Sequence, residues 1–193
     1  MKLRRKLAIL ALLAGFSLCL SGSAFAIAII YISPPAVVTN QGSIFDVGVN
    51  IFGISDLYGF QFDIGFNPSV LSVLSVSEGG FLASGGTTLF SPGSIDKVGG
   101  TITLISDILL TSPPGVTGTG TLASLHVQAI GSGNSPVNLL NVSLFDSVAV
   151  SIPFDISNGI VTVSPAPVPE PSTMFLLGSG LLSLFGLRRK FRK

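Results

Sequence analysis

Apolar and polar residues alternate through much of the middle of the chain. The clearest example is residues 58–66, where every second side chain is apolar: Phe60, Phe62, Ile64 and Phe66. The positions between them are glycine or polar. Successive side chains of a strand point to opposite faces, so this pattern predicts a half-buried β-strand with its phenylalanines in a core.

Shorter stretches repeat this pattern, with clusters of Gly, Pro, Ser and Asn between them. Further strands are predicted at residues 44–52, 70–76, 87–90, 102–104, 125–129, 137–144, 147–152 and 160–163. No segment between the two termini has a helical period. About 140 residues suffice for one core, so the middle of the chain is predicted to be one antiparallel β-sandwich of eight or nine strands.

The N-terminus has a different pattern, with four basic residues followed by an apolar run over residues 7–20. Ala24 and Ala26 are small residues at the positions that a signal peptidase reads. Residues 1–26 are therefore predicted to be a signal peptide cleaved after Ala26. The only cysteine, Cys19, lies inside this segment, so the exported protein would have no disulfide.

The C-terminus contains three elements in sequence: a proline-rich linker at residues 165–173, an uncharged apolar run at 174–187 and a basic end. Pro169 and Pro171 favour an extended backbone around Glu170. The apolar run would reach only ~21 Å as a helix, short of the ~30 Å membrane core, unless residues 171–173 and snorkelling side chains extend it. The predicted cytoplasmic stop consists of Arg188, Arg189, Lys190, Arg192 and Lys193.

These C-terminal elements resemble the PEP-CTERM sorting signal of Gram-negative bacteria. The resemblance implies that an exosortase, an integral membrane transpeptidase, recognises Pro169, Glu170 and Pro171 and removes the helix. Until then the helix would anchor the precursor in the inner membrane. The alternative is an ordinary C-terminal membrane anchor after a proline-rich linker.

The charge of the middle region differs from that of the whole chain. Between residues 27 and 167 only Lys97 is basic, against eight acidic residues, which gives a net charge of −7. Phosphate binding needs lysine and arginine, so the sequence argues against a nucleic-acid ligand.

Residues 57–71, LYGFQFDIGFNPSVL, are similar to the early strand of cohesin-like domains. The later stretches 118–123, 141–144 and 159–163 follow in the order of that family. The resemblance covers roughly residues 28–164 and implies a nine-stranded jelly-roll β-sandwich, a domain that we place at residues 27–164. It also implies a fold related to some carbohydrate-binding modules. Cohesins of cellulosomes bind dockerin modules through one sheet face.

Candidate chemistry is sparse, and we predict neither an enzyme nor a cofactor. His126 is the single histidine. By alternation it lies on a solvent-facing sheet surface, and no nucleophile motif accompanies it. The acidic residues are scattered, so no metal site is predicted, although turn aspartates could hold a structural calcium ion. Asp63 and Glu78 are candidates for the pair of carboxylates that glycoside hydrolysis needs. The favoured interpretation is that the acidic residues keep the domain soluble.

The glycine-rich segment 78–93 contains the apolar pair Phe81 and Leu82. These side chains either form an exposed recognition patch or fold back as a plug over a sandwich edge, and the plug is favoured.

Two functions remain open. The first is an exported surface or matrix protein whose sandwich mediates adhesion or protein–protein contact. The second is a carbohydrate-binding module that acts near exopolysaccharide; the absence of tryptophan weakens it, because sugar-binding surfaces usually stack exposed aromatic rings. Signal peptidase and exosortase are the predicted processing partners, and the cell surface or the extracellular space is the predicted destination.

Overall fold

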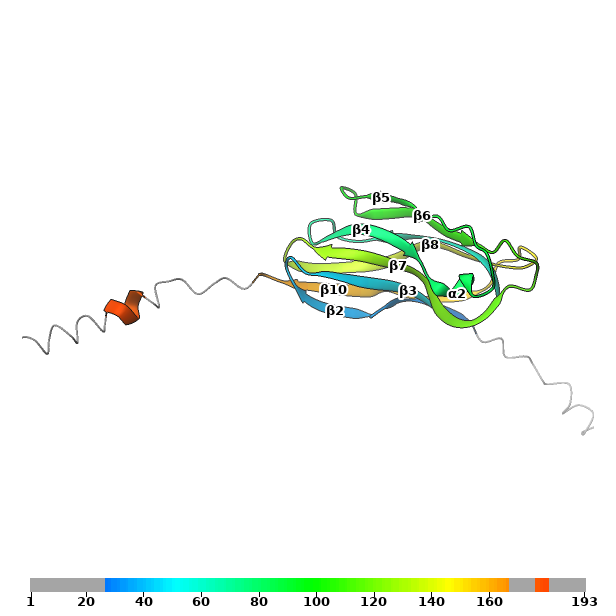
Figure 1. Cartoon of the computed structure of the whole chain (residues 1–193), viewed down its shortest axis with the longest axis horizontal. Coiled ribbons are helices and arrows are strands. Elements are labelled where there is room, and N and C mark those ends of the chain that lie inside the picture. The colour runs from blue at the N-terminus through cyan, green and yellow to red at the C-terminus, as the bar shows by residue number, and fades with distance from the viewer. Residues whose placement is uncertain (1–26, 167–175, 181–193) are drawn as a thin grey trace, which may run out of the picture.

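Ten strands and one four-residue helix build residues 27–166 of the computed structural model, which describes residues 27–166 and 176–180 (Figure 1). The elements are β1 (Ala28–Ser33), β2 (Ala36–Asn40), β3 (Ile44–Gly65), β4 (Leu71–Glu78), α2 (Gly80–Ala83), β5 (Ser94–Asp96), β6 (Thr101–Ile108), β7 (Val116–Ala129), β8 (Gly133–Asp146), β9 (Phe154–Ser157) and β10 (Gly159–Ser164). The predicted mostly β architecture is confirmed.

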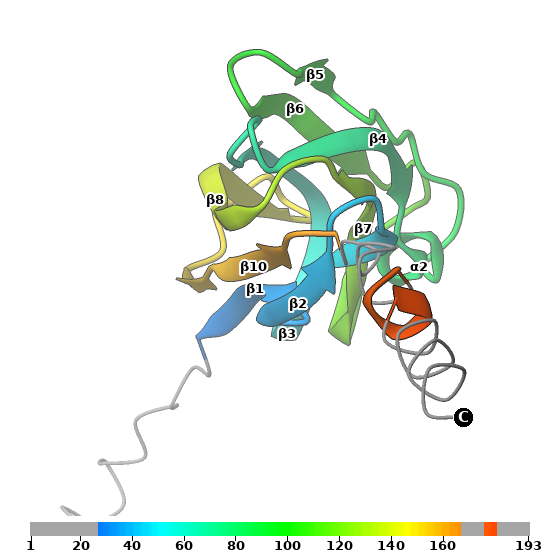
Figure 2. The same ribbon diagram turned by 90° about the vertical axis from the view of Figure 1, so that its left-hand side faces the viewer.

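The strands form two layers that share the long strand β3 (Figure 2). Its first half pairs with β7 and β1, and β4 and β9 extend this layer, which we call the rear layer regardless of the view. The second half of β3 pairs with β6 and β8, and β5 extends this second layer, which we call the front layer. Residues 133–137 of β8 also pair with β10, which in turn pairs with β2.

The predicted purely antiparallel pairing is wrong at two places. β1 runs parallel to β9, and β2 runs parallel to β10. Both parallel pairs join the first strands of the domain to its last ones, so they close the sandwich with segments that are far apart in the sequence. A parallel pair needs a long connection, and here the rest of the domain supplies it.

Residues 44–52 and 58–66 were predicted as separate strands, but residues 44–65 form the single strand β3. The pairing of β3 with β7 shifts register twice between Ile51 and Leu57. Gly53 and Asp56 both have a positive φ in this stretch. The interruption of the apolar pattern therefore marks bulges that redirect the strand from the rear layer to the front layer, because bulges increase local bend and twist.

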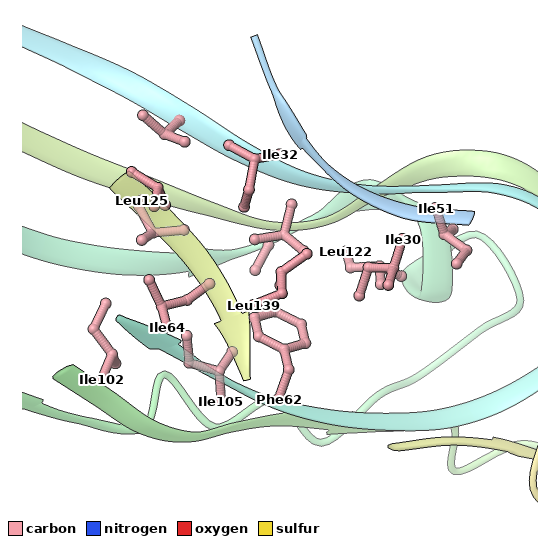
Figure 3. Packing of buried hydrophobic residues seen from close by; sticks show 14 of the residues in the cluster. Ile30, Ile32, Ile51, Phe62, Ile64, Ile102, Ile105, Leu122, Leu125 and Leu139 are labelled. Carbon is pink, nitrogen blue, oxygen red and sulfur yellow. The ribbon is translucent and has the colours of Figure 1, made fainter. Parts of the chain in front are cut away.

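The core lies between the layers (Figure 3). It contains Phe60, Phe62, Ile64 and Phe66, as the alternation predicted. The rings of Phe60 and Phe62 stack with centroids 5.5 Å apart. Side chains of the rear layer, among them Ile51 and Leu125, pack against them from the other side.

Two shorter predictions fail at the ends of strands. Residues 147–152 form no strand: residues 147–149 turn, where the Asp146 carboxylate accepts hydrogen bonds from the main-chain N–H groups of Val148 and Val150, and Ser151 forms only an isolated bridge with Phe145. Residues 87–90 run beside β6 but form only an isolated bridge, between Thr88 and Leu109.

The segment with Phe81 and Leu82 contains α2, a short helix that the sequence did not predict. Both side chains are buried, which confirms the plug. Phe81 packs against β7 where Gly120 has no side chain, and a Cβ atom there would lie 2.7 Å from the ring.

The predicted signal peptide, with Ala24 and Ala26, lies outside the described residues. So do Pro169, Glu170, Pro171 and the basic residues 188–193. Of the predicted membrane helix at 174–187, only residues 176–180 are described, and they are helical. Within the described part of the chain, no helix is long and apolar enough to cross a membrane.

Candidate protein-binding face

The outer face of the front layer carries two rows of exposed apolar side chains. One row includes Phe145 and Ile108, which lie on either side of Gly59. The second includes Leu140 and Leu104, near Asp63. These four side chains are 41%, 44%, 44% and 58% exposed. We call the four residues the front patch.

The strand β3 has glycines, and so no side chains, beneath the front patch. A Cβ atom at Gly59 would lie 3.6 Å from the Ile108 side chain, and one at Gly65 would lie 3.3 Å from Leu140 Cδ1. The apolar side chains of β6 and β8 therefore lie over the backbone of β3. The result is a face with apolar rows and a polar centre, in which Gln61 is flanked by Ser106 and Ser143.

Asp63 fixes the geometry of the second row. One carboxylate oxygen accepts a 2.7 Å hydrogen bond from the main-chain N–H of Leu104, and the other accepts a 2.7 Å bond from Asn141 Nδ2. Leu104 and Asn141 have φ of 60° and 49°, and the register of β3 with both neighbouring strands shifts beside Asp63. A single side chain thus holds two bulges, one on β6 and one on β8.

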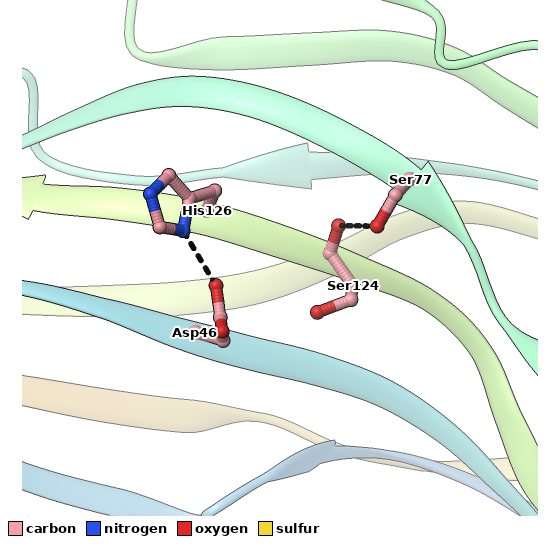
Figure 4. A network of polar contacts seen from close by, with 4 residues as sticks. All are labelled: Asp46, Ser77, Ser124 and His126. Atoms are coloured by element: carbon pink, nitrogen blue, oxygen red, sulfur yellow. Dashed lines mark hydrogen bonds and ion pairs between the residues drawn. The ribbon is translucent and has the colours of Figure 1, made fainter.

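His126 lies on the outer face of the rear layer, as the alternation predicted (Figure 4). Its Nδ1 lies 2.7 Å from Asp46 Oδ1 on β3, a pairing that the sequence did not predict. The nearby Ser77 hydroxyl donates to the main-chain carbonyl of Ser124. This exposed pair lies on a flat strand surface, so it offers no enclosed site for catalysis.

The structure does not bring the predicted pair Asp63 and Glu78 together. Asp63 points outward from the front layer, whereas Glu78 accepts a 2.6 Å hydrogen bond from the Thr88 hydroxyl. The acidic neighbour of Glu78 is Asp107, and burial together with the charge of Glu78 raises the pKa of Asp107 to about 6. Sequence reasoning missed Asp107 because the predicted strand ended at residue 104, where a bulge reverses the faces of the residues that follow.

A depression of about 540 Å³ lies between α2 and the first residues of β7. Gly80, Phe81 and Ser84 line one side, and residues 116–121 line the other. None of these residues carries a titratable side chain, so the lining contains hydroxyl groups but no acid or base to activate them.

No three His, Cys, Asp or Glu side chains gather as a metal-ligand group in residues 27–166 and 176–180. The turn aspartates instead accept hydrogen bonds from main-chain N–H groups. Asp96 Oδ1 accepts from Val98 and Gly99, and these bonds lower the pKa of Asp96.

Residues 30–163 match the family model of the cohesin domain, and residues 167–190 match that of the PEP-CTERM protein-sorting motif. The chain therefore belongs to the cohesin family and carries a PEP-CTERM motif after its cohesin domain. No curated protein sequence matches the chain.

Solved cohesins share this fold. A non-cellulosomal cohesin from Archaeoglobus fulgidus is 18% identical and superposes with a TM-score of 0.59, covering 78% of this chain and 97% of that one. A type II cohesin domain from the cellulosome of Acetivibrio cellulolyticus is 16% identical, with a TM-score of 0.62 and coverage of 70% and 95%. A type I cohesin–dockerin complex from Clostridium thermocellum gives 13% identity, a TM-score of 0.60 and coverage of 72% and 100%.

Proposed function

We propose that this protein is exported, is processed by an exosortase at its PEP-CTERM motif, and uses its cohesin domain to bind a partner protein at the cell surface. The front patch is the proposed contact surface, and the observation that carries this proposal is the pair of exposed apolar rows, the second of which is held in place by Asp63. The match to the sorting motif supports the route to the surface.

The chemistry of the front patch suits a protein partner. Leucine, isoleucine and phenylalanine side chains on a flat sheet offer a surface that another apolar surface can cover. The net charge of −7 between residues 27 and 167 would attract a partner with basic groups around an apolar contact. Solved relatives include cohesin–dockerin complexes, and a dockerin-like module is one partner of this kind.

The experiment places a photo-crosslinking amino acid at Leu140 in one version of the protein and at Ile44 in another. Ile44 is a matched control, because it is an apolar residue that is 53% exposed and lies at the start of β3, in the rear layer. In the native host, a crosslink to one discrete protein is expected from position 140 and not from position 44. Equal crosslinking at both positions, or none at 140, would reject the front patch as the contact.

A binding assay with host exopolysaccharide tests the carbohydrate alternative. Tyr31 and Tyr58 are both partly buried, and the Tyr58 hydroxyl donates to the main-chain carbonyl of Thr111. Neither tyrosine ring is fully exposed for the stacking that sugar binding generally uses. We therefore expect no saturable binding of host exopolysaccharide. Saturable binding that survives Leu140→Asp would replace protein contact with carbohydrate binding.

A further inference from the structure

Two carboxylates meet at the open edge of the sandwich, where β4 of the rear layer lies beside β6 of the front layer (Figure 2). Asp107 alternates with the buried residues Ile105 and Leu109, so it points into the interior, and it is only 3% exposed. Glu78 ends β4 and is exposed. The pair therefore has one deeply buried member and one member at the surface.

The Asp107 carboxylate has no well-formed hydrogen bond, and the nearby main-chain N–H of Ile108 offsets only part of the cost of burying its charge. Neither of its oxygens has a hydrogen-bond partner. Glu78 cannot donate while it is ionised, and the Thr88 hydroxyl already donates to Glu78 Oε1 at 2.6 Å. A buried charge without a partner is costly, and buried charges in proteins are normally paired or coordinate a metal.

We propose that Asp107, Glu78 and the Thr88 hydroxyl oxygen hold a divalent cation, and that Ca²⁺ is the ion that suits this site. All three groups are hard oxygen ligands, and Ca²⁺ accepts six to eight such ligands in flexible geometry, with water completing the shell. Mg²⁺ demands a stricter octahedron. Zinc favours nitrogen and sulfur, yet the single cysteine lies at position 19 and His126 lies on the outer face of the rear layer.

The position of this site gives the ion a structural role. Because β4 and β6 belong to different layers, the ion would link the two layers at the edge that the Thr88 segment covers. Glu78 gives access from solvent. The front patch lies on the outer face of the front layer, whereas Asp107 faces the core, so this proposal does not depend on the proposed function.

The test uses the full chain in a non-ionic detergent, freed of metal by a chelator, and measures Ca²⁺ binding by calorimetry and thermal unfolding by circular dichroism. Two carboxylates make a weak site, so we expect a Kd on the order of 10⁻⁴–10⁻³ M. Saturating Ca²⁺ should raise the Tm by roughly several degrees, because the ion binds only the folded state. Mg²⁺ should give a smaller shift.

Three variants assign the site. Asp107→Asn and Glu78→Gln keep the shape of the side chains and remove one charge, and each should weaken Ca²⁺ binding at least about tenfold. Asp107→Asn should fold and melt no lower than the metal-free wild type, because it removes the buried charge. Asp155→Asn, an exposed control on β9, should bind as the wild type does. The proposal is overturned if Ca²⁺ gives neither heat nor a Tm shift up to roughly 10 mM, ten times the weakest Kd expected, or if Asp107→Asn binds like the wild type.

Discussion

Replacing Asp63 with alanine removes the side chain that holds the two bulges beneath the front patch. The change deletes two hydrogen bonds of 2.7 Å, to the Leu104 N–H and to Asn141 Nδ2. Hydrogen bonds to charged groups contribute ~1.5–3 kcal/mol each when buried, and ordinary ones about 1 kcal/mol. Because Asp63 is partly exposed, the lower value applies, and the expected loss of unfolding free energy is about 2 kcal/mol.

Reversible unfolding in urea, followed by circular dichroism, measures this loss. For a domain of this size a loss of about 2 kcal/mol corresponds to a fall in Tm of roughly 6–10 °C. Asp63→Asn keeps one acceptor oxygen and should lose about half as much. Asp155→Ala removes an exposed carboxylate from β9 and should change stability by less than about 0.5 kcal/mol.

A double-mutant cycle separates the hydrogen bond from other effects of the substitution. Asn141→Gly removes the amide while permitting the φ of 49° at this position. Its coupling energy with Asp63→Ala should be about 1 kcal/mol. A stability loss in Asp63→Ala no larger than in Asp155→Ala, or a coupling energy of zero, would refute the role of Asp63 in holding the bulges.

Three further predictions address the core, an acid-sensitive contact and processing. Phe62→Asp places a charge at a fully buried position and should cost about 3–5 kcal/mol of unfolding free energy. Gln61→Asp, on the opposite face, should be tolerated, and equal losses in urea titrations would mean that the register is wrong. A hydrogen bond from the Ser147 hydroxyl lowers the pKa of Asp56. The contribution of Asp56 to the free energy of unfolding is therefore present above pH ~4 and is lost as the pH falls through its folded-state pKa. The stability difference between wild type and Asp56→Asn should shrink on acidification, and an increase would contradict the assignment. Replacing residues 169–171 by alanine should leave the chain unprocessed in the inner membrane; wild type that keeps Lys193 beside an active exosortase would show that the C-terminal segment is only an anchor.

Local sequence pattern predicts the parts of this fold that depend on strand periodicity. The alternation over residues 58–66 places Phe60 and Phe62 in the core, and the same rule places His126 on a surface. Phe81 and Leu82 form the plug because apolar side chains beside flexible glycines can fold back onto the sandwich edge. In each case the neighbouring residues determine which face a side chain occupies.

Local sequence pattern does not predict which distant strands pair with each other. The parallel pairs β1–β9 and β2–β10 join segments at opposite ends of the domain, and nothing in either segment specifies its partner. The role of Asp63 depends on bulges in two other strands, at Leu104 and Asn141. The position of Asp107 also depends on a bulge, because the alternation of Ile102 and Leu104 continues to Ser106 and Ile108, and only the bulge at Leu104 turns Ile105 and Asp107 inward.

The acidic residues of the cohesin domain do more than keep it soluble. Four of them accept main-chain N–H groups at bulges and turns: Asp56, Asp63, Asp96 and Asp146. Each stabilises a backbone segment that has no ladder partner at that point, and a carboxylate is a strong acceptor for such groups. Part of the negative charge of the domain therefore comes from carboxylates that hold its loops and bulges. Since Lys97 is the only basic residue between residues 27 and 167, this charge is almost uncompensated, and a partner of the front patch would meet a surface that favours basic groups.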